Sequence, residues 1–378
     1  MSKRIVFVIN SLAGGGAERV FSTILSASAP YRDEYDVSVA LLDREERAYG
    51  LPRDMSVQQL NSRHSLPRSI AGLARTARRE KAQLAVSFLT RSNVAAAFAM
   101  MMRRQPFVIS ERVDTAAHLA TGRFAWASKF LVRLTYPRAA AVIAVSHGVA
   151  DTLVSDFGVE RRRISVVFNP VDLDRIASLA AEDPSIEMRA DDCIAMGRLV
   201  PNKNFALAIE GFARSGRRGR LVLIGTGPLH AELRALGDQL GLGERLVMPG
   251  FVENPYALLA RGGLFVLSSN AEGFPNALVE AMAVGLPVVA TDCRSGPAEV
   301  LATSLDGVKV AEGEGGLLVP ANDVPAMADA IGLMGEPGRA RAFGEQGRRR
   351  AAEFSVDRAV GAYWGIIESV MANGVAEP

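Results

Sequence analysis

The unit that decides the fold is Leu264-Phe-Val-Leu-Ser-Ser-Asn-Ala-Glu-Gly-Phe-Pro-Asn-Ala-Leu-Val-Glu280. Its four leading apolar residues predict a buried strand, a turn follows, and Pro275 suits the first turn of a helix. Backbone amides at residues 273–276 are expected to bind a phosphate, because the helix dipole favours an anion there. Glu272 and Glu280 flank this site, and their carboxylates can accept hydrogen bonds from sugar and ribose hydroxyls. The alternative interpretation makes Glu272 a helix cap and Glu280 a solvated helix position.

The same alternation of strand and helix extends along the whole chain. Short apolar runs without polar alternation are typical of strands buried on both faces of a parallel sheet. Segments with helical periodicity, such as Glu18–Ala29 and Ile70–Lys81, lie between them. This pattern predicts an α/β protein built from doubly wound, Rossmann-like sheets. The expected strands are Arg4–Asn10, Val37–Leu42, Leu84–Phe88, Phe107–Ser110, Ala141–Val145, Cys193–Met196, Arg220–Ile224, Arg245–Met248, Leu264–Leu267, Pro287–Ala290 and Gly316–Val319.

An interruption in the alternation predicts two domains, as does the length of 378 residues. Asn169-Pro-Val-Asp172 and the polar stretch that follows to Asp192 are interpreted as an interdomain linker. We therefore predict a first domain over 1–175, a second over 176–355, and a C-terminal helix and tail over 356–378 that crosses back to the first domain. Two such domains would face each other across a cleft, with ligands beyond the carboxyl ends of the strands.

Composition and charge indicate in which compartment the protein works and what kind of partner it meets. Cys193 and Cys293 are too few for a disulfide framework and are expected to be core residues in a reducing compartment. We expect neither a secretory signal, because the first strand is short and runs into a glycine loop, nor a spanning helix, because no run approaches the ~20 apolar residues that one needs. The net charge is only +2, yet residues 1–170 hold 24 basic and 14 acidic residues, and the remainder holds 19 and 27. This asymmetry suggests that the first half meets an anionic partner, although solvated helix faces would explain it equally well.

Two further loops follow predicted strands. Gly14-Gly15-Gly16 opens a helix, where glycines allow a ligand to approach the backbone, but the dinucleotide spacing is missing. A purely structural turn is the alternative. Arg198 and Lys203 lie in the loop Gly197-Arg-Leu-Val-Pro-Asn-Lys203 and could clamp a diphosphate, or could be two solvated cations.

Taken together, these motifs resemble glycosyltransferase family 4, whose members have the GT-B fold. The resemblance rests on the glycine loop with Glu18-Arg19, Ser110-Glu111-Arg112, Asn169-Pro-Val-Asp172, the Arg198–Lys203 loop and the Glu272–Glu280 pair, and it spans about Arg4 to Trp364. It implies a retaining, metal-independent transfer from a nucleoside-diphosphate sugar, usually a UDP-sugar, to a glycan or a polyprenyl-diphosphate-linked saccharide in bacterial polysaccharide biosynthesis. It implies no cofactor.

The resemblance also implies roles for individual residues. Arg198 and Lys203 match the diphosphate clamp, Glu280 the carboxylate on the ribose, and Glu272 the acid that contacts the transferred sugar. His118 resembles a cleft histidine of some members. The implied catalytic residues are Glu272, His118, Arg198 and Lys203, and the implied donor-binding residues are Gly15, Gly16, Arg198, Lys203, Gly227, Phe251, Val252, Glu272, Gly273, Phe274, Pro275, Asn276, Leu278 and Glu280.

Basic residues of the first half suggest where an acceptor or a membrane would bind. Arg123, Lys129 and Arg133 surround Trp126 and Phe130, and basic residues interleaved with large apolar ones are typical of membrane-surface binding. Core packing of the two aromatic residues is the alternative. The weaker candidates for acceptor or membrane contact are Arg19, Arg75, Arg78, Arg79 and Arg112. We expect a cytoplasmic protein, peripheral on the inner face of the membrane if this interpretation is right.

Other functions remain open at this level. Asp172-Leu-Asp174 has the spelling of a metal motif, but it lies in the predicted linker, so no metal is expected. A sugar-nucleotide epimerase, a phosphorylase or a non-catalytic nucleotide-sugar-binding protein could share the fold. A nicotinamide oxidoreductase lacks its fingerprint, and nucleic-acid binding lacks a recognised module.

Overall fold

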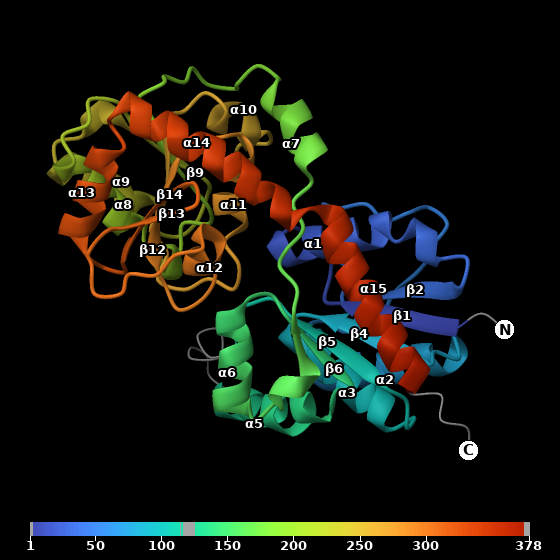
Figure 1. Cartoon of the computed structure of the whole chain (residues 1–378). Coiled ribbons are helices and arrows are strands. Elements are labelled where there is room, and N and C mark those ends of the chain that lie inside the picture. Colours follow the sequence, from blue (N-terminus) through green and yellow to red (C-terminus); the bar gives the residue numbers. More distant parts are fainter. Residues whose placement is uncertain (1–2, 114, 116–124, 374–378) are drawn as a thin grey trace. The chain divides into compact units, whose positions relative to one another are not determined.

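The computed structural model describes residues 3–113, 115 and 125–373, which form two compact units (Figure 1). Unit 1 comprises residues 1–170 and 356–378, and unit 2 comprises residues 171–355. The expected boundary at residue 175 falls inside helix α7 (Leu173–Ala180) of unit 2. Asp172 caps this helix, because its side chain accepts a hydrogen bond of 3.0 Å from the amide of Arg175. The stretch from Asp172 to Asp192 is therefore part of unit 2, and the linker interpretation is wrong.

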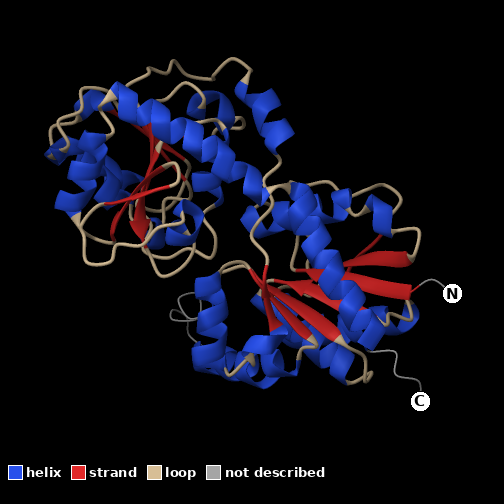
Figure 2. Cartoon of the chain, in the orientation of Figure 1, coloured by secondary structure: helices blue, strands red, loops and turns tan. Residues whose placement is uncertain are grey.

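Unit 1 contains a parallel sheet of seven strands in the order β3-β2-β1-β4-β5-β6-β7. The chain runs from β1 toward one edge and returns at β4 to build the other half, as in a doubly wound sheet. Helices α2, α3 and α5 pack side by side, and α1 packs against α15 (Figure 2). The strands are β1 Lys3–Ile9, β2 Tyr35–Leu41, β3 Ser56–Gln59, β4 Leu84–Phe88, β5 Phe107–Glu111, β6 Ala141–Ala144 and β7 Ile164–Val166. The helices are α1 Gly16–Ala27, α2 Leu66–Arg79, α3 Thr90–Met101, α5 Ala125–Thr135, α6 His147–Phe157 and α15 Val356–Asn373.

Helix α15 supplies part of the core of unit 1, although it comes from the far end of the sequence. Trp364 is fully buried, stacks on Tyr31 with ring centroids 4.5 Å apart, and donates a hydrogen bond of 2.8 Å to Ser28. Tyr363 stacks on Phe88 of β4 at 5.7 Å. The expected return of the C-terminal helix to the first domain is thus confirmed.

Unit 2 repeats the architecture with the order β10-β9-β8-β11-β12-β14-β13, in which only β13 runs antiparallel to its neighbour. Buried leucine, isoleucine and valine residues of the strands pack against α8 and α13. The strands are β8 Cys193–Met196, β9 Leu221–Ile224, β10 Leu246–Gly250, β11 Leu264–Leu267, β12 Val288–Asp292, β13 Ala311–Gly313 and β14 Gly316–Pro320. Besides α7, the helices are α8 Phe205–Arg214, α9 His230–Gln239, α10 Pro255–Leu259, α11 Asn276–Ala283, α12 Pro297–Leu301, α13 Val324–Leu333 and α14 Pro337–Ala351.

Both cysteines are buried, as expected for core residues. Burial raises the pKa of the Cys193 and Cys293 thiols to about 12, so both stay protonated at neutral pH. Among the described residues, no helix is both long and apolar enough to cross a membrane.

Candidate functional site

The candidate site of unit 2 lies where the strand order reverses. Strands β9 and β10 lie to one side of β8, and β11 lies to the other, so the loops that follow β8 and β11 adjoin at the carboxyl edge. Open α/β sheets bind ligands at such a point. The two loops are joined by hydrogen bonds from the Asn270 amide to the Asn202 carbonyl (2.8 Å) and from Ser268 Oγ to the Lys203 carbonyl (3.0 Å). Two motifs about 70 residues apart in sequence therefore share one site.

Glu272 and Lys203 form an ion pair at this point. Lys203 Nζ lies 2.5 Å from Glu272 Oε1, and the same oxygen accepts a hydrogen bond of 2.6 Å from Ser269 Oγ. The Glu272 side chain is only 8% exposed. Helix α11 has Pro275 at its N-cap position and no side-chain cap. The interpretation of Glu272 as a helix cap is therefore wrong.

Glu280 lies in the second turn of α11 and is 5% exposed, so it is not a solvated helix position. Leu278, one of the implied donor-binding residues, is fully buried on the same helix. Burying a carboxylate costs free energy that a solvated helix position avoids, so the burial itself favours a role for Glu280 beyond helix solvation.

The backbone before α11 offers fewer amides than expected. The Asn276 amide donates to the Phe274 carbonyl (3.0 Å), and Pro275 has no N–H group. The prediction of an open amide row over 273–276 is therefore wrong for Asn276 and Pro275. The Phe274 ring is buried against Phe354 at 5.5 Å, so only its backbone could contact a ligand.

The remaining implied donor-binding residues of unit 2 lie in loops at the same carboxyl edge of the sheet. Arg198 is exposed after β8, and within the described residues its guanidinium makes no hydrogen bond or ion pair. Gly227 follows β9, where a Cβ atom would lie 2.4 Å from the Leu199 carbonyl oxygen, so packing of two loops already requires glycine there. After β10, Phe251 is 78% exposed and Val252 is half-buried.

The glycine loop of unit 1 also follows a strand at its own reversal point, between β1 and β4. Gly15 occupies the N-cap of α1, and Gly16 begins the helix. A Cβ atom on Gly15 would lie 2.4 Å from Glu18 Oε2, so that carboxylate already faces the helix N-terminus. This contact supports the structural interpretation of the turn.

A polar cluster beside this loop was not predicted. Arg91 bonds to Asp43 and, at 3.3 Å, to Asn10, residues that follow β4, β2 and β1. His64 lies 3.2 Å from Asp43 and 3.6 Å from Glu45, and these three form the one group in the described residues with metal-ligand spacing. The guanidinium of Arg91 on Asp43 disfavours a second cation there. The sequence signal that could have indicated this cluster is the position of Asp43, an acidic residue that follows β2.

Arg112 does not lie at the surface, and its assignment to acceptor or membrane contact is wrong. It is buried, donates 2.6 Å to the Tyr363 hydroxyl of α15, and bonds to Asn169. The adjacent Glu111 is buried as well, and this burial raises the pKa of its carboxyl. Ser110-Glu111-Arg112 therefore joins β5 to α15.

The other basic candidates are accessible. Arg75, Arg78 and Arg79 are exposed on α2, and Arg19 is half-buried on α1. On α5, Trp126 is 75% and Phe130 61% exposed, so core packing of these two residues is excluded. His118 and Arg123 lie outside the described residues.

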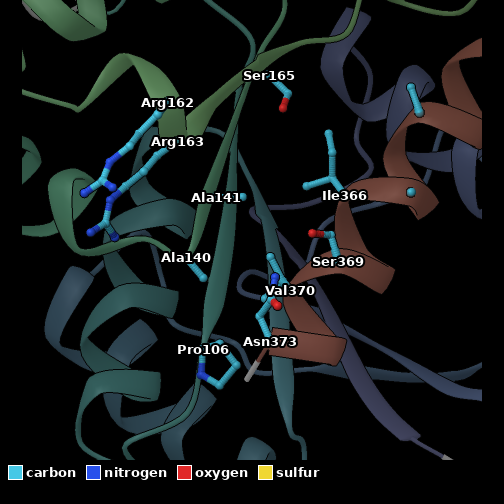
Figure 3. Close-up of a pocket in the computed structure, with 12 residues that line it drawn as sticks. Pro106, Ala140, Ala141, Arg162, Arg163, Ser165, Ile366, Ser369, Val370 and Asn373 are labelled. Carbon is cyan, nitrogen blue, oxygen red and sulfur yellow. The ribbon is translucent and has the colours of Figure 1, made fainter. Parts of the chain in front are cut away.

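A separate groove of about 840 Å³ lies in unit 1 between α15 and the start of β6 (Figure 3). The guanidinium groups of Arg162 and Arg163 point away from Ile366 and Ser369 on the helix wall. Arg162 pairs with Glu160, and Arg163 donates to the Ala139 carbonyl. Pro106 and Ala140, which line the groove, precede their strands, so it is not at the carboxyl edge.

Comparison with known proteins identifies the family. Residues 14–175 match the family described as Glycosyltransferase Family 4, and residues 190–334 match Glycosyl transferases group 1. The chain is 30% identical over 366 residues to N-acetylgalactosamine-N,N'-diacetylbacillosaminyl-diphospho-undecaprenol 4-alpha-N-acetylgalactosaminyltransferase of Campylobacter jejuni, covering 94% of this chain and 96% of that protein. A second N-acetylgalactosaminyltransferase of that organism, acting on a longer PP-undecaprenol-linked glycan, is 26% identical, covering 88% of each chain.

Solved structures agree on the fold. HepE of Anabaena in complex with UDP superimposes with a TM-score of 0.76 at 22% identity, over 97% of this chain and all of that one. The protein belongs to glycosyltransferase family 4 and has the GT-B fold. It is therefore a glycosyltransferase, which is favoured over the epimerase, phosphorylase and non-catalytic nucleotide-sugar-binding protein considered from the sequence.

Proposed function

We propose that the protein transfers an N-acetylhexosamine from its UDP-sugar, with retention of configuration, to a saccharide carried on a polyprenyl diphosphate. The observation that carries the donor assignment is the Lys203–Glu272 ion pair at the reversal point of unit 2. The two Campylobacter relatives, named for N-acetylgalactosamine transfer to undecaprenol-linked acceptors, support the choice of sugar and acceptor.

The chemistry follows from the charges. As the bond from the sugar to the diphosphate breaks, negative charge grows on the phosphate oxygens, and fixed cations aimed there lower the barrier. Arg198 is exposed at this edge, and Lys203 has two donor hydrogens beyond the one given to Glu272. The acceptor oxygen bonds to the anomeric carbon from the face that the diphosphate leaves, and the leaving phosphate takes the acceptor proton, so retention requires no protein nucleophile.

A donor screen tests this proposal. The purified protein is incubated with a short polyprenyl-diphosphate glycan and with individual UDP-sugars or the same sugars on another nucleoside diphosphate, and free nucleoside diphosphate and elongated lipid are measured with and without EDTA. We expect UDP-N-acetylhexosamines to support acceptor-dependent UDP release that EDTA does not abolish. UDP release without an elongated product would refute the acceptor, and an equal rate with nucleotides of another base would refute the UDP assignment.

The acceptor proposal includes binding to an anionic membrane through unit 1. Trp126, Phe130 and Arg133 recur at helical spacing on α5 and are exposed, and Lys129 lies between them. An aromatic pair beside cations is suited to the lipid interface, where rings sit at the headgroup level. Exposed Arg75, Arg78 and Arg79 of α2 add positive charge to the same unit.

Vesicle sedimentation tests this surface. We expect the protein to bind vesicles containing anionic lipid at low salt, and the double variant Trp126→Ser/Phe130→Ser to lose roughly tenfold or more of that affinity. The matched control is Phe251→Ser, which removes an equally exposed aromatic ring from unit 2 and should bind vesicles like the wild type. Equal binding by both variants would exclude α5 as the contact.

A further inference from the structure

Ser269 is a buried serine at the candidate donor site, and none of the motifs described above assigns it a role. It lies two residues beyond β11, is 1% exposed, and its hydroxyl lies 2.6 Å from Glu272 Oε1. This hydroxyl donates, because an ionised carboxylate can only accept.

The backbone around Ser269 is fixed from the neighbouring strand. Its carbonyl accepts a hydrogen bond of 2.6 Å from Thr291 Oγ1, in β12. The Glu272 carbonyl in turn accepts 2.5 Å from Ser295 Oγ, in the loop after β12. Both ends of the turn that carries the carboxylate are therefore anchored to one strand and its loop.

The hydrogen bonds on Glu272 are distributed unequally. Oε1 accepts from both Lys203 and Ser269, whereas Oε2 makes no hydrogen bond within the described residues. The side chain is thus held through one oxygen, and the second is available to a substrate hydroxyl. Lys203 alone would hold it poorly, since its flexible ammonium is also the cation available to a diphosphate.

We infer that Ser269 is a positioning residue, which holds Glu272 oriented toward the transferred sugar while Lys203 engages the donor diphosphate. This inference rests on the proposed function. It predicts that the Ser269 hydroxyl affects turnover more than nucleotide binding, because its partner is the sugar-contacting acid rather than a group assigned to UDP.

The test compares Ser269→Ala with Ser269→Thr, which keeps the hydroxyl. For Ser269→Ala we expect kcat for UDP-sugar turnover to fall roughly 10- to 100-fold, as for loss of a hydrogen bond to a charged group. UDP affinity by titration calorimetry should stay within about twofold, and Ser269→Thr should recover most of the rate. Ser215→Ala, which removes a hydroxyl bonded to the Phe212 carbonyl at the end of α8, is the matched control and should keep full activity.

A double-mutant cycle separates positioning from general damage to the loop. If Ser269 acts through Glu272, Ser269→Ala should cost little further activity in a Glu272→Gln background. An equal fractional loss in both backgrounds, unchanged kcat in Ser269→Ala, or a parallel loss of UDP affinity would overturn the inference. Absence of turnover by the wild type with any UDP-sugar would instead refute the proposed function, and with it the role of Ser269.

Discussion

At the residue scale, the assignment of Arg198 and Glu280 to the donor makes a direct prediction. Arg198→Ala and Glu280→Ala should each weaken UDP binding roughly 10- to 100-fold, because each removes a hydrogen bond that involves a charged group. Titration calorimetry measures this, and circular dichroism checks that unit 2 remains folded. Glu210→Ala, on α8 and outside the site, is the control. Unchanged UDP affinity in both variants would remove the donor assignment.

A second prediction concerns Asp192, which precedes β8 and is fully buried. It pairs with Arg220 at 2.5 Å and accepts backbone bonds from Arg189 (2.9 Å) and Arg220 (3.0 Å). Burial alone would raise the pKa of this carboxyl, but these hydrogen bonds outweigh it and lower the pKa. We expect Asp192→Asn to reduce the free energy of unfolding of unit 2 by about 3 kcal/mol at neutral pH.

The pH dependence has a definite sign. The pKa of Asp192 is lower in the folded state than in the unfolded state. The contribution of its carboxylate to the free energy of unfolding is therefore complete above the unfolded-state pKa of about 3.9, and it disappears as the pH falls through the folded-state pKa. Urea unfolding at pH 7, 5 and 3 measures the difference in the free energy of unfolding between the wild type and Asp192→Asn. This difference should stay constant down to about pH 5 and then become smaller. A difference that grows toward low pH would contradict this. Glu160→Gln, which breaks only exposed ion pairs, should change little.

Much of the site could be predicted at this scale, because charged side chains after apolar strands mark the carboxyl edge of a sheet. Glu272 and Lys203 stand out for that reason, and Glu280 stands out as an acid on an otherwise apolar helix. Ser269 did not, because a serine after a strand is common, and only the fold brings its hydroxyl onto a carboxylate three residues later. The burial of Arg112 was missed for a similar reason, since its partner Tyr363 is 251 residues away in sequence.

At the element scale, the long buried strands followed from the sequence and the short edge strands did not. β3, β7 and β13 have three or four residues each and lie at or next to sheet edges. Their sequences, Ser-Val-Gln-Gln, Ile-Ser-Val and Ala-Glu-Gly, lack a continuous apolar run because one side meets solvent. Such strands form because a neighbouring strand offers hydrogen bonds, which local sequence does not encode.

The junction of β5 with α15 gives an element-scale prediction. Tyr363→Phe removes a hydroxyl that bonds to Ser110 at 2.7 Å and to the buried Arg112 guanidinium. Leaving a buried cation short of a partner should cost unit 1 about 1–3 kcal/mol. Tyr31→Phe is the control, because the Tyr31 ring stacks on Trp364 at the partly exposed edge of the core. Urea unfolding followed by tryptophan fluorescence measures the free energy of unfolding of each variant. Equal values for Tyr363→Phe and Tyr31→Phe would show that the junction of β5 with α15 contributes nothing to stability.

At the scale of the whole molecule, unit 1 is formed by two segments of the chain that lie on either side of unit 2 in sequence. Unit 2 is a continuous segment, whereas unit 1 is completed only by α15, after unit 2 has been made. The core of unit 1 contains Tyr363, Trp364 and Ile367 in full burial. Each large side chain of this kind stabilises a core by about 3–5 kcal/mol, so the three together contribute roughly 9–15 kcal/mol, which is comparable to the whole stability of a typical domain.

A stop codon after Ser355 should therefore unfold unit 1 and leave unit 2 intact. The chain has two tryptophans, and neither lies in unit 2, so fluorescence of a Trp126→Phe form reports Trp364 in unit 1 alone. The full-length Trp126→Phe protein should show a cooperative fluorescence transition. The truncated chain should yield a protease-resistant fragment that corresponds to residues 171–355 and keeps a cooperative transition by circular dichroism. Survival of a resistant fragment from residues 1–170 would show that the β-sheet and its own helices suffice, and that α15 is an accessory to unit 1 rather than part of its core.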